Sequence, residues 1–232
     1  MNIKKKINTT SNIQFPDPRV LPEASDGLLY VGGNLEPNTL LHAYGAGIFP
    51  WPLEKEYPLF WFCPQPRGIL EFSQLHIPKS LEKIRKKNLY HFTYNQEFRK
   101  VMEECAKQPR PGQDGTWIIP EMLPAYERFH QLGHAHSIEC WRENSLVGGL
   151  YGVYVKGVFS GESMFHLEDN VSKLCLIEMV ESLKKNGLTW MDIQMLTPVT
   201  EAIGGSYLNR TEFLCLLDKT HLRKLPEKLV FL

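Results

Sequence analysis

Three strand-like segments between residues 135 and 165 constrain the fold of this chain more than any other feature. They read "AHSIECWREN", "SLVGGLYGVYVKG" and "VFSGESMF", and each follows the previous one after a short break. Strands joined by so few residues pair antiparallel, because a parallel connection needs a long crossover. The sequence therefore predicts an antiparallel meander at the centre of the fold.

Helical patterns precede and follow this meander. Ahead of it, helices are predicted in "PKSLEKIRKK", in "QEFRKVMEECAKQ" and in "PEMLPAYERFHQLG", the last from Pro120 to a stop at Gly133. Behind it, Asn170 is expected to cap a helix in "VSKLCLIEMVESLKKNG", whose apolar stripe is Leu174, Ile177, Val180 and Leu183. The strand "LTWMDIQML" and a last helix in "RTEFLCLLDKTHLRKL" follow.

This order of elements resembles that of a GNAT-type acyltransferase domain, so we predict an α+β (mixed α/β) fold. Acetyl-CoA, the usual donor of that class, is held by a Gly-rich turn at a helix N-terminus. The corresponding segment here, "HLEDNVSK", has two acidic residues and no glycine. The segment disfavours a CoA donor, and we expect no cofactor.

The first 65 residues differ from the rest in texture. Prolines recur in "FPDP", "IFPWP" and "CPQP", between short apolar runs. A strand in "GLLYVGG" and a helix in "NLEPNTLLHAYGAG" are predicted there. We expect residues 1–65 to form a small, loop-rich α/β domain and residues 66–232 to form the GNAT-like domain.

Composition excludes several classes of protein. Lys plus Arg and Asp plus Glu number 26 each, so no overall field holds the chain on nucleic acid or on an anionic membrane. The 5 cysteines include no CxxC pair, which favours reduced thiols. Basic residues at the N-terminus precede no apolar segment, and no run of about 18 apolar residues occurs. We expect a cytoplasmic protein that does not contact membranes.

One basic run stands out in this neutral chain. Lys83, Arg85, Lys86 and Lys87 lie within "KIRKKN", at the end of a predicted helix. Such a run is most often a solvated helix face, but it could also contact phosphates.

The motifs together point to one family. "GLLYVGGNL", "AYGAGIFPW", "FWFCPQPRGIL", "GTWI", "FSGESMFH" and "MDIQM" occur in the order found in leucyl/phenylalanyl-tRNA–protein transferases, which the chain resembles over about residues 15 to 215. The resemblance implies an enzyme that moves Leu or Phe, with Met as a further candidate, from aminoacyl-tRNA to the N-terminal Arg or Lys of a protein. That transfer marks the acceptor protein for degradation.

The resemblance also implies an apolar pocket for the donor side chain. Its expected residues are Met164, Phe159, Leu150, Met179 and Met191. Thioethers are flexible enough to adapt to either a leucyl or a phenylalanyl group. Glu162 would face the α-ammonium of the donor; the alternative for Glu162 is an ion pair with Lys173 or Arg142.

Asp192 and Gln194 are the expected catalytic residues. They lie two apart on a predicted strand, so their side chains share a face. By the resemblance, Asp192 orients Gln194, whose amide oxygen draws on the attacking α-amine. An aminoacyl ester is already activated, so positioning matters more than a strong base.

Trp51 and Trp117 match tryptophans that the family associates with the terminal adenosine of tRNA, and an indole offers a stacking face for a base. The other tryptophans, Trp61, Trp141 and Trp190, are expected in the core. The chain departs from the family pattern at Val199 and Thr200, where a His-Leu pair is usual.

The sequence disfavours a metal site and a serine hydrolase site. His130, His134 and His136 lack a carboxylate or an HExxH pattern to complete a ligand set, so no metal is expected. Ser163 lacks the G-x-S-x-G elbow of a hydrolase. Two alternatives stay open: an N-acyltransferase with another acyl donor, and a non-catalytic module that binds RNA or protein N-termini.

Overall fold

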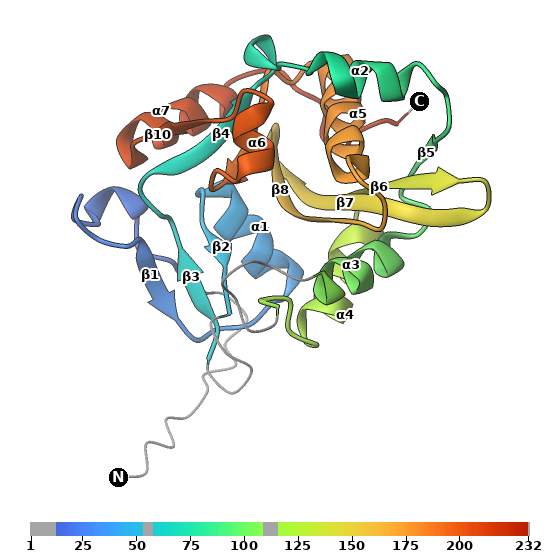
Figure 1. The fold of residues 1–232 in the computed structure, drawn as a ribbon. Helices are drawn as coiled ribbons and strands as arrows, with labels where there is room; N and C mark the ends of the chain where they lie inside the picture. Colours follow the sequence, from blue (N-terminus) through green and yellow to red (C-terminus); the bar gives the residue numbers. More distant parts are fainter. Residues whose placement is uncertain (1–12, 53–57, 109–115, 232) are drawn as a thin grey trace.

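The computed structural model describes residues 13–52, 58–108 and 116–231. The basic N-terminal stretch and most of the Pro- and Gly-rich loop before Trp117 lie outside these residues. The described chain forms a large sheet covered by helices and a small sheet beside it (Figure 1). The predicted α+β class is confirmed.

The large sheet has seven strands, in the order β10-β4-β9-β8-β7-β6-β5. Its centre is the predicted meander, now seen as β6 (Ala135–Arg142), β7 (Ser145–Val155) and β8 (Val158–His166). Both pairings in this meander are antiparallel. A bulge interrupts the second pairing: Gly152 lies opposite Gly161 and Tyr151 opposite Ser163, so Glu162 is an extra residue in β8.

A helix then carries the chain to a parallel strand. α5 (Val171–Lys185) crosses from β8 to β9 (Trp190–Gln194), and β9 pairs with β8 in parallel at Ser160 and Asp192. β9 does not close the sheet, because β4 (Arg67–Glu71) pairs antiparallel with its other side. The edges are β10 (Ser206–Leu208) and β5 (His91–Tyr94).

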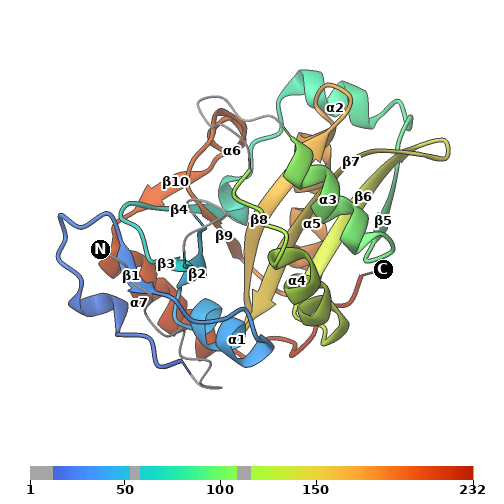
Figure 2. The same cartoon turned by 90° about the horizontal axis from the view of Figure 1, so that it is seen from below.

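Helices cover both faces of the sheet. α3 (Phe98–Lys107) and α4 (Met122–Gln131) lie in front of β6, β7 and β8 in Figure 2, and α5 lies behind them. Each face has its own buried apolar cluster. The predicted stripe of α5 is fully buried, but burial extends to most other sides of this helix as well.

The small sheet has the order β1-β3-β2 and comes from the N-terminal part of the chain. Its strands are β1 (Leu28–Val31), β2 (Phe49–Pro50) and β3 (Phe60–Phe62). Between β1 and β2, α1 (Pro37–Gly45) packs against β7 and α4, so the N-terminal part contacts the large sheet directly. The division at residue 65 remains a proposal.

The other helices are α2 (Lys79–Arg85), α6 (Pro198–Ala202) and α7 (Arg210–His221), with short 3-10 turns at Pro18–Val20 and Phe72–Gln74. α6, β2 and β10 were not expected from the sequence. Among the described residues, none of the helices combines the length and apolar character needed to cross a bilayer.

One predicted helix start and one predicted side-chain cap were wrong. α4 begins at Met122, because Pro120 and Glu121 form a preceding turn. Asn170 does precede α5, but its backbone is left-handed (φ 68°) and its side chain caps no N–H. The Asn170 side-chain oxygen instead accepts from Lys173 Nζ at 3.2 Å.

Candidate active site

A cavity of about 570 Å³ opens where β8, the end of β9 and the end of β2 meet. β8 contributes residues on both sides of its bulge, and β9 contributes its last two residues and the loop that follows. The lining residues include Phe49, Pro50, Trp51, Trp117, Gly161, Glu162, Ser163, Met164, Ile193, Gln194 and Val199. The wall is therefore mainly apolar and aromatic, with a few polar groups.

Glu162 is the one ionisable residue among these polar groups that is buried, with 9 % of its surface exposed. Its Oε1 accepts from Tyr44 at 2.8 Å and from Gln194 Nε2 at 2.9 Å. Its Oε2 has no hydrogen-bond partner among the described residues. Burial raises the pKa of Glu162 to about 8, although the bonds from Tyr44 and Gln194 favour the charged form.

Two buried tyrosines hold this carboxyl from behind. The hydroxyls of Tyr44 on α1 and Tyr126 on α4 lie 2.6 Å apart, and Tyr44 donates onward to Glu162. Burial raises the pKa of both phenols well above the usual value, so both stay protonated. A protonated phenol can always donate, and Oε1 of Glu162 is therefore held in one place.

Gln194 ends β9 in an unusual backbone conformation. Its φ is +60°, a left-handed value that is uncommon for residues other than glycine. Its backbone N–H donates to Asp192 Oδ1 at 2.9 Å, and its side-chain Nε2 donates to Glu162. The amide group of Gln194 thus lies beside Glu162 at the cavity wall, and Oε1 is left as its acceptor end.

Asp192 lies one layer behind the cavity, buried and bonded on both oxygens. Arg67 donates to it twice, from Nε to Oδ1 at 2.8 Å and from Nη2 to Oδ2 at 2.7 Å. Ser160 on β8 also donates to Oδ2, at 3.1 Å. Both members of the ion pair are nearly fully buried, so the pair is shielded from salt and water.

Comparison with known proteins gives the family. The model of the leucyl/phenylalanyl-tRNA protein transferase family matches residues 69–218, and the model of its N-terminal domain matches residues 33–65. The chain belongs to the leucyl/phenylalanyl-tRNA protein transferases. The resemblance inferred from the motifs is confirmed, and the chain is a member of an aminoacyltransferase family.

Relatives that carry this name are similar over most of their length. A protein from Shewanella putrefaciens is 44% identical over 205 residues, which cover 88% of this chain and 86% of the relative. One from Anaeromyxobacter dehalogenans is 44% identical over 205 residues, or 88% of this chain and 87% of the relative. Among solved structures, a GCN5-related N-acetyltransferase from Kribbella flavida aligns with TM-score 0.40 and 9% identity, covering 72% of this chain and 58% of that one.

The cavity gathers part of the set expected from the family. Met164, Trp51 and Trp117 line it together with Glu162 and Gln194. Trp51 also packs against Phe62, with ring centroids 6.2 Å apart. Of the tryptophans expected in the core, Trp61 and Trp190 are buried, whereas Trp141 is half-buried on β6.

Four expected pocket residues lie elsewhere. Phe159, Leu150, Met179 and Met191 do not line this cavity; all are buried in the apolar cluster between the sheet and α5. Their role in a donor pocket stays a prediction. Only Met164, which packs on the edge of the same cluster, reaches the cavity.

The alternative ion pairs of Glu162 are not formed. Arg142 pairs with Glu168 at 3.0 Å, and Lys173 donates to Asn170. Glu162 therefore keeps Oε2 without a charged partner, as a site for a cation requires.

The basic run on α2 divides into two groups. Lys83, Lys86 and Lys87 are exposed. Arg85 is bonded to Glu82 at 3.2 Å and to Glu178 at 2.9 Å, so its guanidinium is already engaged. The three lysines are the better candidates for phosphate contact.

His130 and the two positions that depart from the family pattern, Val199 and Thr200, each have neighbours that account for them. His130 stacks on Phe98, with centroids 4.3 Å apart, and its Nδ1 donates to the carbonyl of Ala135. No cluster of potential metal ligands occurs in the part of the chain that the structure describes. Val199 lines the cavity, while Thr200 completes a capping box with Thr197 at the start of α6.

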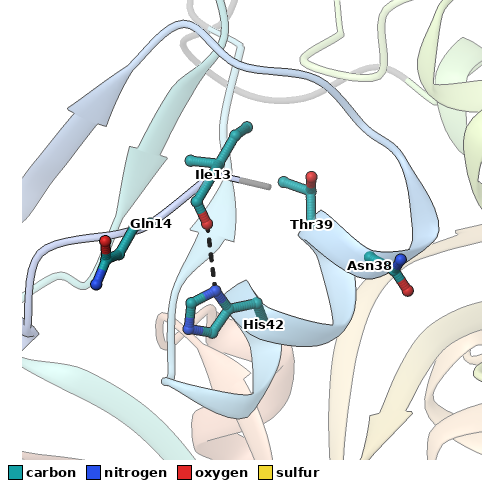
Figure 3. A pocket seen from close by; sticks show the side chains of 5 residues that line it. All are labelled: Ile13, Gln14, Asn38, Thr39 and His42. Atoms are coloured by element: carbon teal, nitrogen blue, oxygen red, sulfur yellow. Dashed lines mark hydrogen bonds between the residues drawn. The ribbon is translucent and has the colours of Figure 1, made fainter. Parts of the chain in front are cut away.

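A second hollow, of about 400 Å³, lies at the first turns of α1 (Figure 3). Asn38, Thr39 and His42 line it from the helix, and His42 Nδ1 donates to the carbonyl of Ile13 at 3.3 Å. Tyr44, which reaches Glu162, is not part of its wall. This hollow is separate from the candidate active site.

Sequence reasoning missed Arg67, Tyr44, Tyr126 and Ser160. Arg67 offered one signal: it is a charged residue directly before the apolar run "GILEF", at the start of what proves to be a buried strand. Tyr44 lies within the motif "AYGAGIFPW", but the motif does not indicate its bond to Glu162. Tyr126 offered no signal, because it lies in an ordinary helical pattern and meets Tyr44 only through the tertiary fold.

Proposed function

We propose that this protein transfers a leucyl or phenylalanyl group from aminoacyl-tRNA to the N-terminal Arg or Lys of an acceptor protein. The new N-terminus marks that protein for degradation. One observation carries the proposal beyond the family name: Glu162 and Gln194 lie bonded to each other in the wall of one apolar cavity, and Oε2 of Glu162 is unpartnered.

Glu162 is suited to hold the α-ammonium of the donor. Burial disfavours the charged form of this carboxyl, so its pKa is raised to about 8 although the charge of Arg67 lowers it. An ammonium group placed at Oε2 supplies the missing positive charge and favours the carboxylate. The charge-assisted hydrogen bond then fixes the donor by the group that every aminoacyl ester shares.

The rest of the cavity suits the apolar and aromatic parts of the donor. Met164 is half-buried in the wall and presents a flexible thioether to the leucyl or phenylalanyl side chain. Trp51 and Trp117 offer indole faces for the terminal adenine, and such stacking does not read the rest of the sequence. Together these contacts accept several tRNAs but favour one class of side chain.

The reaction needs positioning more than acid or base strength. The α-amine of the acceptor attacks the ester carbonyl, a C–N bond forms, and the C–O bond to the tRNA ribose breaks. The proton that the amine loses ends on the ribose oxygen that leaves. Gln194 Oε1 accepts from the attacking amine and aims its lone pair, which raises the fraction of productive encounters.

The acceptor and the location of the enzyme are the remaining parts of the proposal. We assign an N-terminal Arg or Lys as acceptor because the family's acceptor site favours a cationic side chain. Charged tRNA is a substrate of translation, so we place the enzyme in the cytoplasm. Lys83, Lys86 and Lys87 are the candidates for contact with tRNA phosphates.

The direct test is incubation of the protein with leucyl-tRNA and a peptide that begins with Arg. Mass spectrometry should show one added leucine at the N-terminus, and a matched peptide that begins with Asp should stay unmodified. Gln194→Ala should slow single-turnover transfer at saturating tRNA and leave the affinity for leucyl-tRNA nearly unchanged. Equal use of both peptides, or no transfer to either, would contradict the proposal.

A further inference from the structure

The carboxylate of Asp192 has no oxygen left for a substrate. Oδ1 accepts from Arg67 Nε and from the backbone N–H of Gln194, and Oδ2 accepts from Arg67 Nη2 and Ser160 Oγ. The distances lie between 2.7 and 3.1 Å. Asp192 is also absent from the cavity wall. A group so placed has no direct route to the proton of an attacking amine.

Arg67 is held as firmly as the carboxylate it binds. Its guanidinium is 1 % exposed and lies between the rings of Phe49 and Phe213, 4.7 and 4.5 Å from their centroids. Its remaining nitrogen, Nη1, donates to the carbonyl of Gly47 at 3.1 Å. Arg67 therefore joins β9 to the α1–β2 connection and to α7.

The backbone of Gln194 shows what this arrangement holds in place. A left-handed φ costs a non-glycine residue free energy, and such a conformation persists only where the surroundings fix it. The bond from the N–H of Gln194 to Asp192 is one such constraint. Because Arg67 fixes both oxygens of Asp192, it also fixes the acceptor of that bond.

We propose that Arg67 is a positioning residue of the transfer reaction: it makes Asp192 a fixed anchor for the backbone of Gln194 rather than an acceptor of a proton. The expected effect on rate rests on the proposed function, whereas the anchoring of the Gln194 backbone by Arg67 and Asp192 does not. Arg67 touches neither substrate, so its loss should lower the rate of the chemical step and leave substrate binding intact.

The test compares Arg67→Gln, Asp192→Asn and the double variant, in the full chain. Each single variant leaves one buried charge unpaired, whereas Gln and Asn in the double variant form a neutral pair that can hydrogen-bond. Arg67→Lys is a third single variant, which keeps the charge but loses the two-fold bond. Arg210→Lys is the matched control: Arg210 is also buried, and it bonds to the carbonyl of Cys63 and to those of residues 21 and 22.

Single-turnover rates with saturating leucyl-tRNA give the first readout. Each single variant at Arg67 or Asp192 should be slower by about 100-fold, the cost of misplacing a reacting group. KM for leucyl-tRNA and for the peptide should stay within about twofold, and the double variant should recover about tenfold over either single variant. Arg210→Lys should keep the wild-type rate. A double variant as slow as Asp192→Asn would overturn the inference, since the charge itself would then be needed.

Amide hydrogen exchange gives a second readout that needs no activity. The N–H of Gln194 should exchange faster in each single variant and regain protection in the double variant. Unchanged protection in folded Arg67→Lys would equally overturn the inference. If the variants show this exchange pattern but the wild-type protein transfers no leucine, the proposed function is contradicted and the anchoring role of Arg67 still holds.

Discussion

Tyr44 donates to Glu162 at 2.8 Å, although 118 positions separate the two residues in the chain. The bond brings α1 of the N-terminal part to β8 of the large sheet and holds one carboxyl oxygen while the other faces the cavity. Glu162 is a buried acid, and that burial raises its pKa to about 8.

The contribution of Glu162 to the stability of the substrate-free protein should fall as pH rises from about 4.5 to about 8. The folded pKa of Glu162, about 8, is above its ordinary value, so the folded state keeps a proton that the unfolded chain releases. The stabilisation is complete below the unfolded pKa and is lost by the folded one, at most on the order of 5 kcal/mol. The difference in the free energy of unfolding between wild type and Glu162→Gln, measured in urea, should fall by this amount across the range; a difference that does not depend on pH would contradict the prediction.

Glu162→Gln should also remove the preference for a free α-amine. The carboxylate accepts from an ammonium group, and a hydrogen bond to a charged group contributes about 1.5–3 kcal/mol. Wild type should bind leucyl-tRNA at least about tenfold more tightly than N-acetylleucyl-tRNA. The variant should bind both with similar affinity. A filter-binding ratio that is the same in both proteins would place the α-ammonium elsewhere.

Met164→Ala should lower kcat/KM for leucyl and phenylalanyl donors, which corresponds to a loss of about 1–2 kcal/mol in transition-state stabilisation. The loss is smaller than at a fully buried site because Met164 is only half-buried. Met179→Leu is the control. It conserves volume within the core between the sheet and α5, so donor choice should not change. An effect of Met179→Leu on the ratio of leucine to phenylalanine transfer would return that residue to the pocket.

Trp117→Ala should weaken the binding of a minimal donor, 3′-leucyladenosine, by about 1–3 kcal/mol through loss of a stacking face. Trp141→Ala is a matched change at a half-buried tryptophan on β6 that stacks on His91 and does not line the cavity. Titration calorimetry should show weaker binding in the first variant alone. Equal losses in both variants would indicate general destabilisation.

Replacing Lys83, Lys86 and Lys87 by Ala should flatten the salt dependence of tRNA affinity. If these exposed lysines neutralise phosphates, the slope of log affinity against log salt should become less negative by about 2 to 3. Arg85→Ala should change it little, because Arg85 is paired with Glu82 and Glu178. A slope unaffected by the triple change would move the tRNA body to another surface.

The order of elements around the large sheet was predictable because it depends on local patterns. The meander, α5 and β9 each carry their own period of apolar residues, and all three were confirmed. The pairing of β9 with β4 was not expected, since such non-local contacts leave no trace in either segment.

The site was predictable only where the family motifs named its residues. Met164, Trp51 and Trp117 reached the cavity as expected, but Phe159 and Leu150 did not. The bulge at Glu162 shifts the alternation of β8, so side-chain direction there cannot be counted from neighbouring positions. Arg67 escaped notice for a different reason: its partner Asp192 lies 125 positions away.

The wall of the cavity is drawn from both sides of residue 65. Trp51 belongs to the N-terminal part, as does Tyr44 behind Glu162, whereas Glu162 and Gln194 belong to the rest. A chain severed at this point would leave Tyr44 and Trp51 in one piece and Glu162, Asp192 and Gln194 in the other. A mixture of the two pieces would then transfer leucine only when they reassemble, so activity would measure their association.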